Sequence, residues 1–199
     1  MYHIWTHANG DENLFREDRN YTYFLEKYCY HIEPVAETFA YCLMPNHLHV
    51  MVRVKNEIEV LEFLRAKKSN PTLQGFETLG GFSNAISRQF SHLFNGYTQA
   101  YNKLYKRKGS LFIPNFNHKL ITSENYFGTL IAYIHNNPVH HGFVSQPGEW
   151  PHSSWHAYLQ QKLTKVRREE GLSWFGGRNE FLRTHREIKM EKAITLFER

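Results

Sequence analysis

The chain has 199 residues, 41% of them hydrophobic, and a formal net charge of +5 without its 13 histidines. This length and composition suit one domain with a true core. No apolar run approaches the roughly 20 residues of a membrane-spanning helix. The first residues also lack the charged and apolar regions of a secretory signal. Cys29 and Cys42 form no metal-type cluster, so we expect reduced thiols and a cytoplasmic protein.

The positive charge is concentrated in one window. Residues 78 to 123 contain no Asp or Glu, and they carry aromatic residues between six basic ones, namely Arg88, Lys103, Lys106, Arg107, Lys108 and Lys119. Such a window suits a polyanion, and exposed aromatic rings would stack on unpaired bases. The alternative, that most of these rings belong to the core, stays open.

The first part of the chain predicts a strand, a helix and two further strands. The strands are expected at 2–8, 37–44 and 47–54, and the helix runs from a cap at Asp18 or Asn20 to His31, with Pro34 after it. Pro45 and Asn46 separate the last two strands so closely that we expect them to pair antiparallel.

The second part predicts helices and one more strand. We expect a short helix at 57–67, a mobile loop at 69–82, a long helix from Ser83 to about 105, and an edge strand at 110–116. A further helix begins at Thr122 or Ser123 and stops before Pro138, and a last helix covers about 178–197. This order of elements predicts an α+β fold with an antiparallel sheet and helices on one face.

The strand at 47–54 carries the strongest chemical signal. Because side chains alternate along a strand, Leu48 and Val50 point to one face, while His47, His49 and Arg53 point to the other. Imidazoles at i and i+2 can reach one metal ion, and two of them favour a transition-type divalent ion. An arginine further along that face suits a phosphate. The alternative is two histidines on a solvated sheet face.

Three segments resemble known nucleases in order and at similar spacing. Residues 39–49, FAYCLMPNHLH, resemble the signature of single-tyrosine HUH nucleases, in which two histidines flank a hydrophobic residue. Residues 97–102 with 107–112 resemble the middle of the REP-associated tyrosine transposases, the family linked to repetitive extragenic palindromes. Residues 133–144 and 149–154 resemble its C-terminal part. The resemblance covers about residues 2 to 160.

The resemblance implies a ferredoxin-like sheet with the histidines on a central strand. It implies His47 and His49 as ligands of Mg²⁺ or Mn²⁺, Tyr133 as the nucleophile and Asn137 as a third, amide ligand. Tyr126 is the rival nucleophile, and a helix C-cap is the alternative role of Asn137. The implied product is a 5′-phosphotyrosine link with a free 3′-hydroxyl. We expect a catalytic domain at 1–160 and a C-terminal helical extension of unknown role at 161–199.

The chain departs from the family pattern at 6–9, 113–116 and 140–142, where phosphate-contacting basic residues are usual. The candidate DNA contacts are Arg53, His140, His141 and the six basic residues of the window. We expect a partner of single-stranded or hairpin DNA, no membrane, and either a monomer or a homodimer.

Three functions remain to be separated. The first is a metal-dependent single-strand DNA endonuclease and strand transferase, of transposase type. The second is a domesticated protein that binds DNA hairpins without cutting them. The third is a phosphodiesterase directed at RNA.

Overall fold

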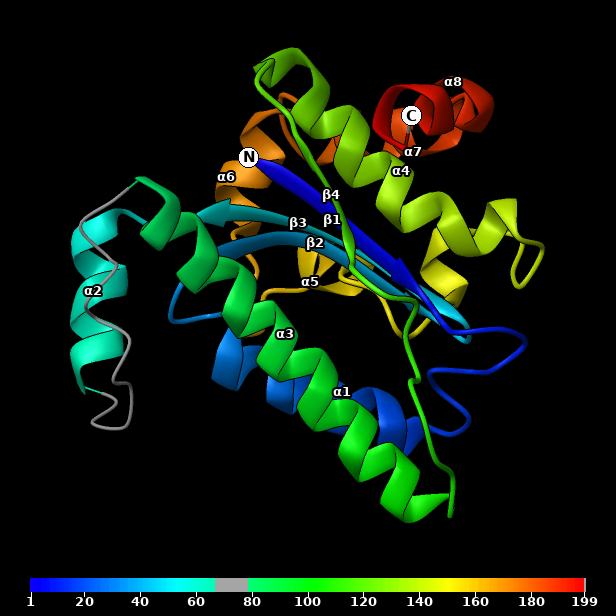
Figure 1. Ribbon diagram of the computed structural model, residues 1–199. Coiled ribbons are helices and arrows are strands. Elements are labelled where there is room, and N and C mark those ends of the chain that lie inside the picture. The colour runs from blue at the N-terminus through cyan, green and yellow to red at the C-terminus, as the bar shows by residue number, and fades with distance from the viewer. Residues whose placement is uncertain (67–78, 199) are drawn as a thin grey trace.

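The computed structural model describes residues 1–66 and 79–198, and its centre is a four-stranded antiparallel sheet in the order β2-β3-β1-β4 (Figure 1). The strands are β1 (Tyr2–His7), β2 (Ala36–Met44), β3 (His47–Val54) and β4 (Asn117–Leu120). Helix α1 (Asp18–His31) joins β1 to β2, and α2 (Glu57–Ala66) and α3 (Leu79–Leu104) lie between β3 and β4. Strand order and connections are those of a ferredoxin-like fold, as predicted.

The alternation of β3 divides the core in two, as the sequence predicts. Leu48, Val50 and Val52 enter one hydrophobic cluster, whereas Met51 enters the cluster on the opposite face. Strand β3 lies between β1 and β2 in the sheet, so both of its edges are paired, and residues 47–52 are buried on both faces. Burial of a large apolar side chain contributes about 1.5–3 kcal/mol, which fixes the strand register.

Helices α1 and α3 cover one face of the sheet (Figure 1). The aromatic residues of the carboxylate-free window belong to this layer. Phe90, Phe94, Tyr97, Tyr101 and Phe112 are buried, and Phe82, Tyr105 and Phe116 pack against them. The alternative of core packing is therefore correct for these rings. Tyr97 and Tyr101 also donate hydrogen bonds to the carbonyl oxygens of Leu14 and Asn13.

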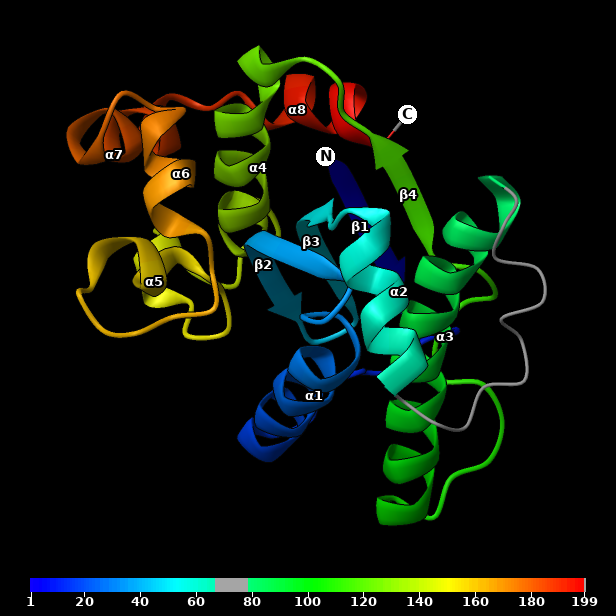
Figure 2. The same ribbon diagram turned by 90° about the vertical axis from the view of Figure 1, so that its left-hand side faces the viewer.

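The opposite face carries a second layer built on α4 (Phe127–His140), which the 3-10 turn η2 (Glu124–Tyr126) precedes. Beyond α4 come the turn η3 (Pro147–Glu149) and the helices α5 (Trp155–Leu159), α6 (Arg168–Ser173), α7 (Arg178–Glu187) and α8 (Met190–Phe197). Figure 2 shows α6, α7 and α8 gathered around α4. The prediction of helices on one face thus describes α1 and α3, whereas α4 and the helices after it cover the opposite face. No helix among the described residues is long and apolar enough to cross a membrane.

A buried chain of hydrogen bonds joins α7 to the sheet. The Nδ1 atom of His185 is 2.7 Å from the Phe181 carbonyl oxygen, and its Nε2 atom is 3.0 Å from Nδ1 of His135. The Nε2 atom of His135 is 2.7 Å from the Ser154 hydroxyl, which accepts from the Tyr41 amide at 2.9 Å. Every member has a partner, so this polar chain stabilises the layer instead of weakening it.

Several predicted boundaries are wrong. No strand forms at 110–116, where Phe112 makes only an isolated bridge with Ala8, and the edge strand β4 comes later, at Asn117–Leu120. Asn115 has a φ of 61°, which interrupts an extended run. Helix α3 begins at Leu79, so the predicted loop at 69–82 ends inside a helix, and the rest of that loop lies outside the described residues.

Two helix signals also had a different outcome. The N-cap of α1 is Glu17, with Asn20 completing a capping box, and Asp18 is the first helical residue. Pro138 does not stop α4, which continues to His140. The carbonyl oxygens of Ala132 and Tyr133 accept from the amides of Asn136 and Asn137. Pro138 removes only the backbone donor for the Ile134 carbonyl oxygen, one bond in the last turn of the helix.

Candidate active site

Strands β1 and β3 bring four histidines to one face of the sheet. Their antiparallel register pairs His7 with His47 and Trp5 with His49, so His3, Trp5 and His7 share the face of the predicted ligands. The His47 and His49 ring centres lie 5.3 Å apart at an interplanar angle of 84°, and the His7 ring stacks on His47 at 4.7 Å. The sequence predicts the pair on β3 but not its partners on β1.

Helix α4 places Tyr133 over this histidine face. The Tyr133 ring lies edge-on to His49 at 5.7 Å and to His3 at 5.8 Å. Asn137, one turn later, donates from Nδ2 to the Tyr133 carbonyl at 3.0 Å. Tyr126 is 43% exposed and makes no ring contact with His47 or His49 among the described residues. The structure thus brings Tyr133 beside the pair formed by His47 and His49 and places Asn137 one turn further along the same helix, while their chemical roles remain predictions.

The C-terminal end of the described chain covers the tyrosine. The Tyr133 hydroxyl donates a hydrogen bond to Oε1 of Glu198, and the same oxygen lies 3.7 Å from Nδ1 of His49. The Phe197 ring packs on Tyr133 at 5.6 Å, which leaves Tyr133 only 1% exposed. Burial, followed by the hydrogen bond to Glu198, raises the pKa of the Tyr133 phenol well above its usual range. In this arrangement the phenol is neutral and shielded.

The two histidines on β3 are electrically neutral. Burial, with smaller contributions from His7 and His141, lowers the pKa of His47 to about 3. Burial and the neighbouring histidines lower the pKa of His49 well below its usual value. A neutral imidazole keeps one nitrogen lone pair, which is the form that binds metals.

The donor set fits a divalent ion in part. Two imidazoles on one tetrahedral or octahedral ion, with nitrogen–metal distances of about 2.1 Å, have ring centres roughly 5 Å apart, close to the 5.3 Å between His47 and His49. Among the residues that the structure describes, no three His, Cys, Asp or Glu side chains converge on such a point. A third donor would be the Asn137 amide or a phosphate oxygen of a substrate.

The predicted DNA-contacting residues are not all available to bind phosphate, because some of their charged side chains are bound within the protein. Arg88 lies on α3, with Lys103 near its end and Lys106 and Lys108 after it, and all four are exposed. Three others are engaged within the protein. Arg53 donates to Glu37 at 2.7 Å and to Glu170 at 2.9 Å, Arg107 donates to Glu12 at 2.7 Å, and Lys119 donates to the Leu196 carbonyl at 2.8 Å.

Two further candidates lie at the site itself. His140 and His141 come at the C-terminal end of α4, and the His141 ring is 4.8 Å from His47. His141 is therefore a predicted DNA contact that lies beside the histidine pair, and His140 is its neighbour.

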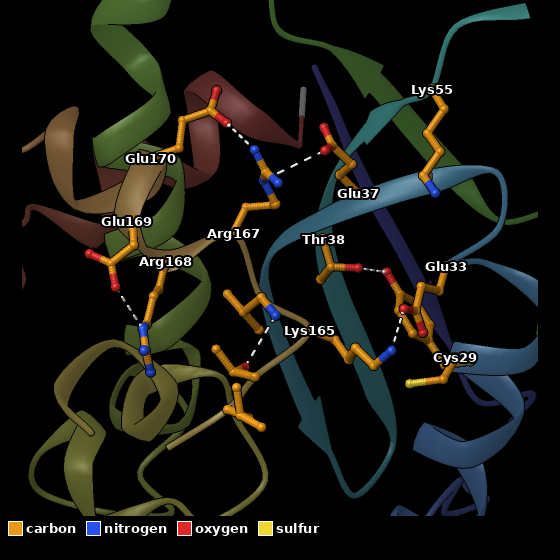
Figure 3. Close-up of a pocket in the computed structure, with 15 residues that line it drawn as sticks. Cys29, Glu33, Glu37, Thr38, Lys55, Lys165, Arg167, Arg168, Glu169 and Glu170 are labelled. Carbon is orange, nitrogen blue, oxygen red and sulfur yellow. Dashed lines mark hydrogen bonds and ion pairs between the residues drawn. The ribbon is translucent and has the colours of Figure 1, made fainter. Parts of the chain in front are cut away.

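A cavity beside the edge strand β2 lies apart from this site. It has a volume of about 540 Å³, and neither the histidines nor Tyr133 lines it. Figure 3 shows ion pairs between charged side chains that line it: Lys165 with Glu33, Arg167 with Glu37 and Glu170, and Arg168 with Glu169. Arg53 binds two of these carboxylates, those of Glu37 and Glu170, so the ion pairs attach residues 163–170 to the sheet.

Sequence reasoning missed His3, His7 and Glu198. The alternation of residues 2–8 places His3 and His7 on one face, and that pattern could have revealed them once β1 was paired with β3. Glu198 is 65 positions from Tyr133, and no spacing rule connects the two.

Comparison with known proteins supports the resemblance. No family model matches the chain. A protein of Haemophilus influenzae named "Putative REP-associated tyrosine transposase" is 26% identical over 127 residues, which are 64% of this chain and 63% of that protein. A solved structure described as the REP-associated tyrosine transposase bound to a REP hairpin matches with a TM-score of 0.54 and 18% identity, covering 82% of this chain and 81% of that one. The chain therefore spans less than two thirds of its curated relative, shares its fold with the solved structure, and is similar in sequence to a REP-associated tyrosine transposase.

Proposed function

We propose that this protein is a single-strand DNA endonuclease and strand transferase of the tyrosine transposase type, acting on hairpin DNA. The observation that carries the proposal is the position of the Tyr133 ring, 5.7 Å from a histidine of a neutral pair on the adjacent strand. The relatives support the substrate class, because one is named a transposase and the other is described as bound to a REP hairpin.

The reaction we propose is a transesterification. The Tyr133 oxygen attacks a backbone phosphorus, and the bond from phosphorus to the 3′ oxygen breaks. The phenol loses one proton and the leaving 3′ oxygen gains one, so the reaction is balanced. Bond energy is conserved in the 5′-phosphotyrosine link, so the strand can be rejoined by the reverse reaction. A tyrosine is a weak nucleophile at neutral pH, with an unperturbed pKa of about 10.

The residues around Tyr133 have separate tasks in this proposal. His47 and His49, with Asn137, would hold Mg²⁺ or Mn²⁺, which when bound neutralises the nonbridging phosphate oxygens and orients the phosphate. The Asn137 amide lowers the pKa of Tyr133 against the larger opposing effect of burial. Glu198 has to leave the hydroxyl before the oxygen can meet a phosphate.

The test uses a labelled DNA hairpin with a single-stranded flank, incubated with Mn²⁺ or Mg²⁺. We expect a covalent protein–DNA adduct with the wild-type protein and none with Tyr133→Phe. Tyr126→Phe is the matched control, because Tyr126 is exposed and precedes the same helix, and it should give a wild-type yield. An undiminished adduct with Tyr133→Phe would remove Tyr133 from the mechanism.

One observation favours a second function, that of a hairpin-binding protein that does not cleave. The Tyr133 hydroxyl is bonded to Glu198 and the ring is buried, so the described conformation is closed to DNA at this atom. Tight hairpin binding with no adduct under any divalent ion, in wild type and in Glu198→Ala alike, would establish this function. Equal activity on RNA hairpins would point instead to the phosphodiesterase.

A further inference from the structure

His3, a fully buried histidine on β1, forms a hydrogen bond with Nδ1 of His49, one of the predicted metal ligands. The Nε2 atom of His3 lies 3.1 Å from Nδ1 of His49, and its Nδ1 atom lies 3.3 Å from the carbonyl oxygen of Phe197. His3 is 0% exposed. Three groups from β3, β1 and the end of α8 therefore form one line of hydrogen bonds.

The first of these contacts has the geometry of a hydrogen bond in the plane of both rings. The His3 and His49 rings are within 13° of parallel, with centres 5.3 Å apart. Each ring nitrogen lies roughly 1.1 Å from its ring centre, so coplanar rings joined by a 3.1 Å contact should have centres about 5.3 Å apart. The rings meet edge to edge and are not stacked face to face.

The carbonyl at the end of the line determines which nitrogens carry protons. A carbonyl oxygen only accepts, so Nδ1 of His3 must carry its proton. A neutral His3 then has a bare Nε2, which accepts the proton of His49 Nδ1. The opposite assignment would place two bare acceptors, His3 Nδ1 and the Phe197 oxygen, against each other. It follows that Nε2 of His49 has a free lone pair.

The other predicted ligand is arranged in the same way. Nδ1 of His47 is 2.8 Å from Oδ1 of Asn46, an acceptor, so its proton also sits on Nδ1. The Glu198 carboxylate, 3.7 Å from Nδ1 of His49, lies beyond hydrogen-bond distance, so His3 is the group that bonds this nitrogen. Both histidines thus have bare Nε2 atoms, although their partners come from unrelated parts of the chain.

We propose that His3 is a positioning residue that holds His49 in its Nδ1-protonated form, which leaves Nε2 of His49 ready to bind a divalent ion. His3 does so because the Phe197 carbonyl accepts its Nδ1 proton and thereby leaves its Nε2 free to accept from His49. This inference rests on the proposed function, since a bare Nε2 matters only if an ion or a reacting group uses it. In metal sites the partner of a ligand's other nitrogen fixes the tautomer and ring orientation, and its loss typically reduces affinity 10- to 100-fold.

The experiment combines two readouts on the full chain. Nitrogen-15 NMR of the histidine rings in the metal-free protein reports which nitrogen of His49 carries the proton. Manganese binding, followed by electron paramagnetic resonance, reports affinity without requiring catalysis. The variants are His3→Phe, which keeps an aromatic ring but no acceptor, and His3→Gln, whose amide can both accept from His49 and donate to Phe197.

We expect a Nδ1 proton on His49 in wild type and in His3→Gln, and a shift to Nε2 in His3→Phe with a loss of Mn²⁺ affinity of about tenfold or more. His47 is the internal control, because its partner is Asn46, and its signals should not move. A Nε2 proton on His49 in wild type overturns the proposal even if His3→Phe does not fold. An unchanged His49 tautomer in folded His3→Phe also overturns it. Absence of Mn²⁺ binding in wild type with the expected tautomer would instead refute the metal site in the proposed function.

Discussion

The contact between Tyr133 and Glu198 predicts that a single substitution will increase the rate of DNA attack. The hydroxyl donates to a carboxylate whose side chain is 25% exposed. A hydrogen bond to an ionised group contributes about 1.5–3 kcal/mol when buried, and partial exposure reduces this to about 1–2 kcal/mol. Because this bond has to break before Tyr133 can reach a phosphate, its energy adds to the barrier.

We therefore expect Glu198→Ala to accelerate adduct formation roughly five- to thirtyfold, since about 1.4 kcal/mol corresponds to tenfold in rate. Glu198→Gln, which keeps an acceptor without the charge, should give a smaller increase. The assay is single-turnover adduct formation on a labelled hairpin with saturating Mn²⁺. Glu191→Ala is the control, because Glu191 is exposed on the same helix α8, and its rate should equal that of wild type.

A decrease with Glu198→Ala would refute the reasoning. Such a result would mean that the carboxylate takes part in the reaction, for example by accepting the proton of Tyr133. Equal rates in wild type, Glu198→Ala and Glu191→Ala would show that the contact opens at no cost, so the hydroxyl would be accessible in solution.

Three further predictions concern stability. Arg53→Met should lower the free energy of unfolding by about 1 kcal/mol in urea and leave hairpin affinity unchanged, because Arg53 is bound to Glu170; a large loss of affinity alone would restore its predicted role in DNA contact. Gly171→Ala should lower the free energy of unfolding by about 2 kcal/mol or more, because the added Cβ would lie 2.2 Å from the Tyr158 hydroxyl; an unchanged melting temperature would contradict this. Burial lowers the pKa of His185 to about 4, so the unfolded chain binds more protons below about pH 6.5 and stability falls from there towards pH 4, by about 3 kcal/mol from this group; unfolding free energies that are equal at pH 7.5 and pH 5 would contradict it.

The sequence was most informative where a short pattern decides the structure. Alternation along 47–54 predicted both faces of β3 correctly, and the tight connection at Pro45 and Asn46 predicted its antiparallel partner. The edge strand could not be predicted in the same way. Asn117–Leu120 has no β-branched residue and is largely exposed, so only its pairing with β1 makes it a strand. Tertiary contact overrides such weak local preference.

The candidate site was predicted in part for a similar reason. His47 and His49 are neighbours on one strand, and Tyr133 was identified through the family resemblance. His3, 46 positions from His49, and Glu198, 65 positions from Tyr133, are brought in by sheet register and by the packing of α8. The contact of Glu198 with Tyr133 leaves no periodic signal, because the two residues lie on different elements. The alternation along β1 points to His3 only after β1 has been paired with β3.

The end of α8 acts on the site in two opposing ways. The carbonyl oxygens of Leu196 and Phe197 carry the partial negative charge of a helix C-terminus, and Lys119 and His3 donate to them. In the proposed relay, the Phe197 carbonyl acts through His3 to keep His49 in the tautomer with a bare Nε2, while the next residue, Glu198, accepts a hydrogen bond from the Tyr133 hydroxyl. If the whole helix moved away when DNA binds, Tyr133 would be freed but His3 would lose its acceptor. Rotation of the Glu198 side chain alone would free Tyr133 and leave the relay intact, so the geometry favours local opening at Glu198 over departure of α8.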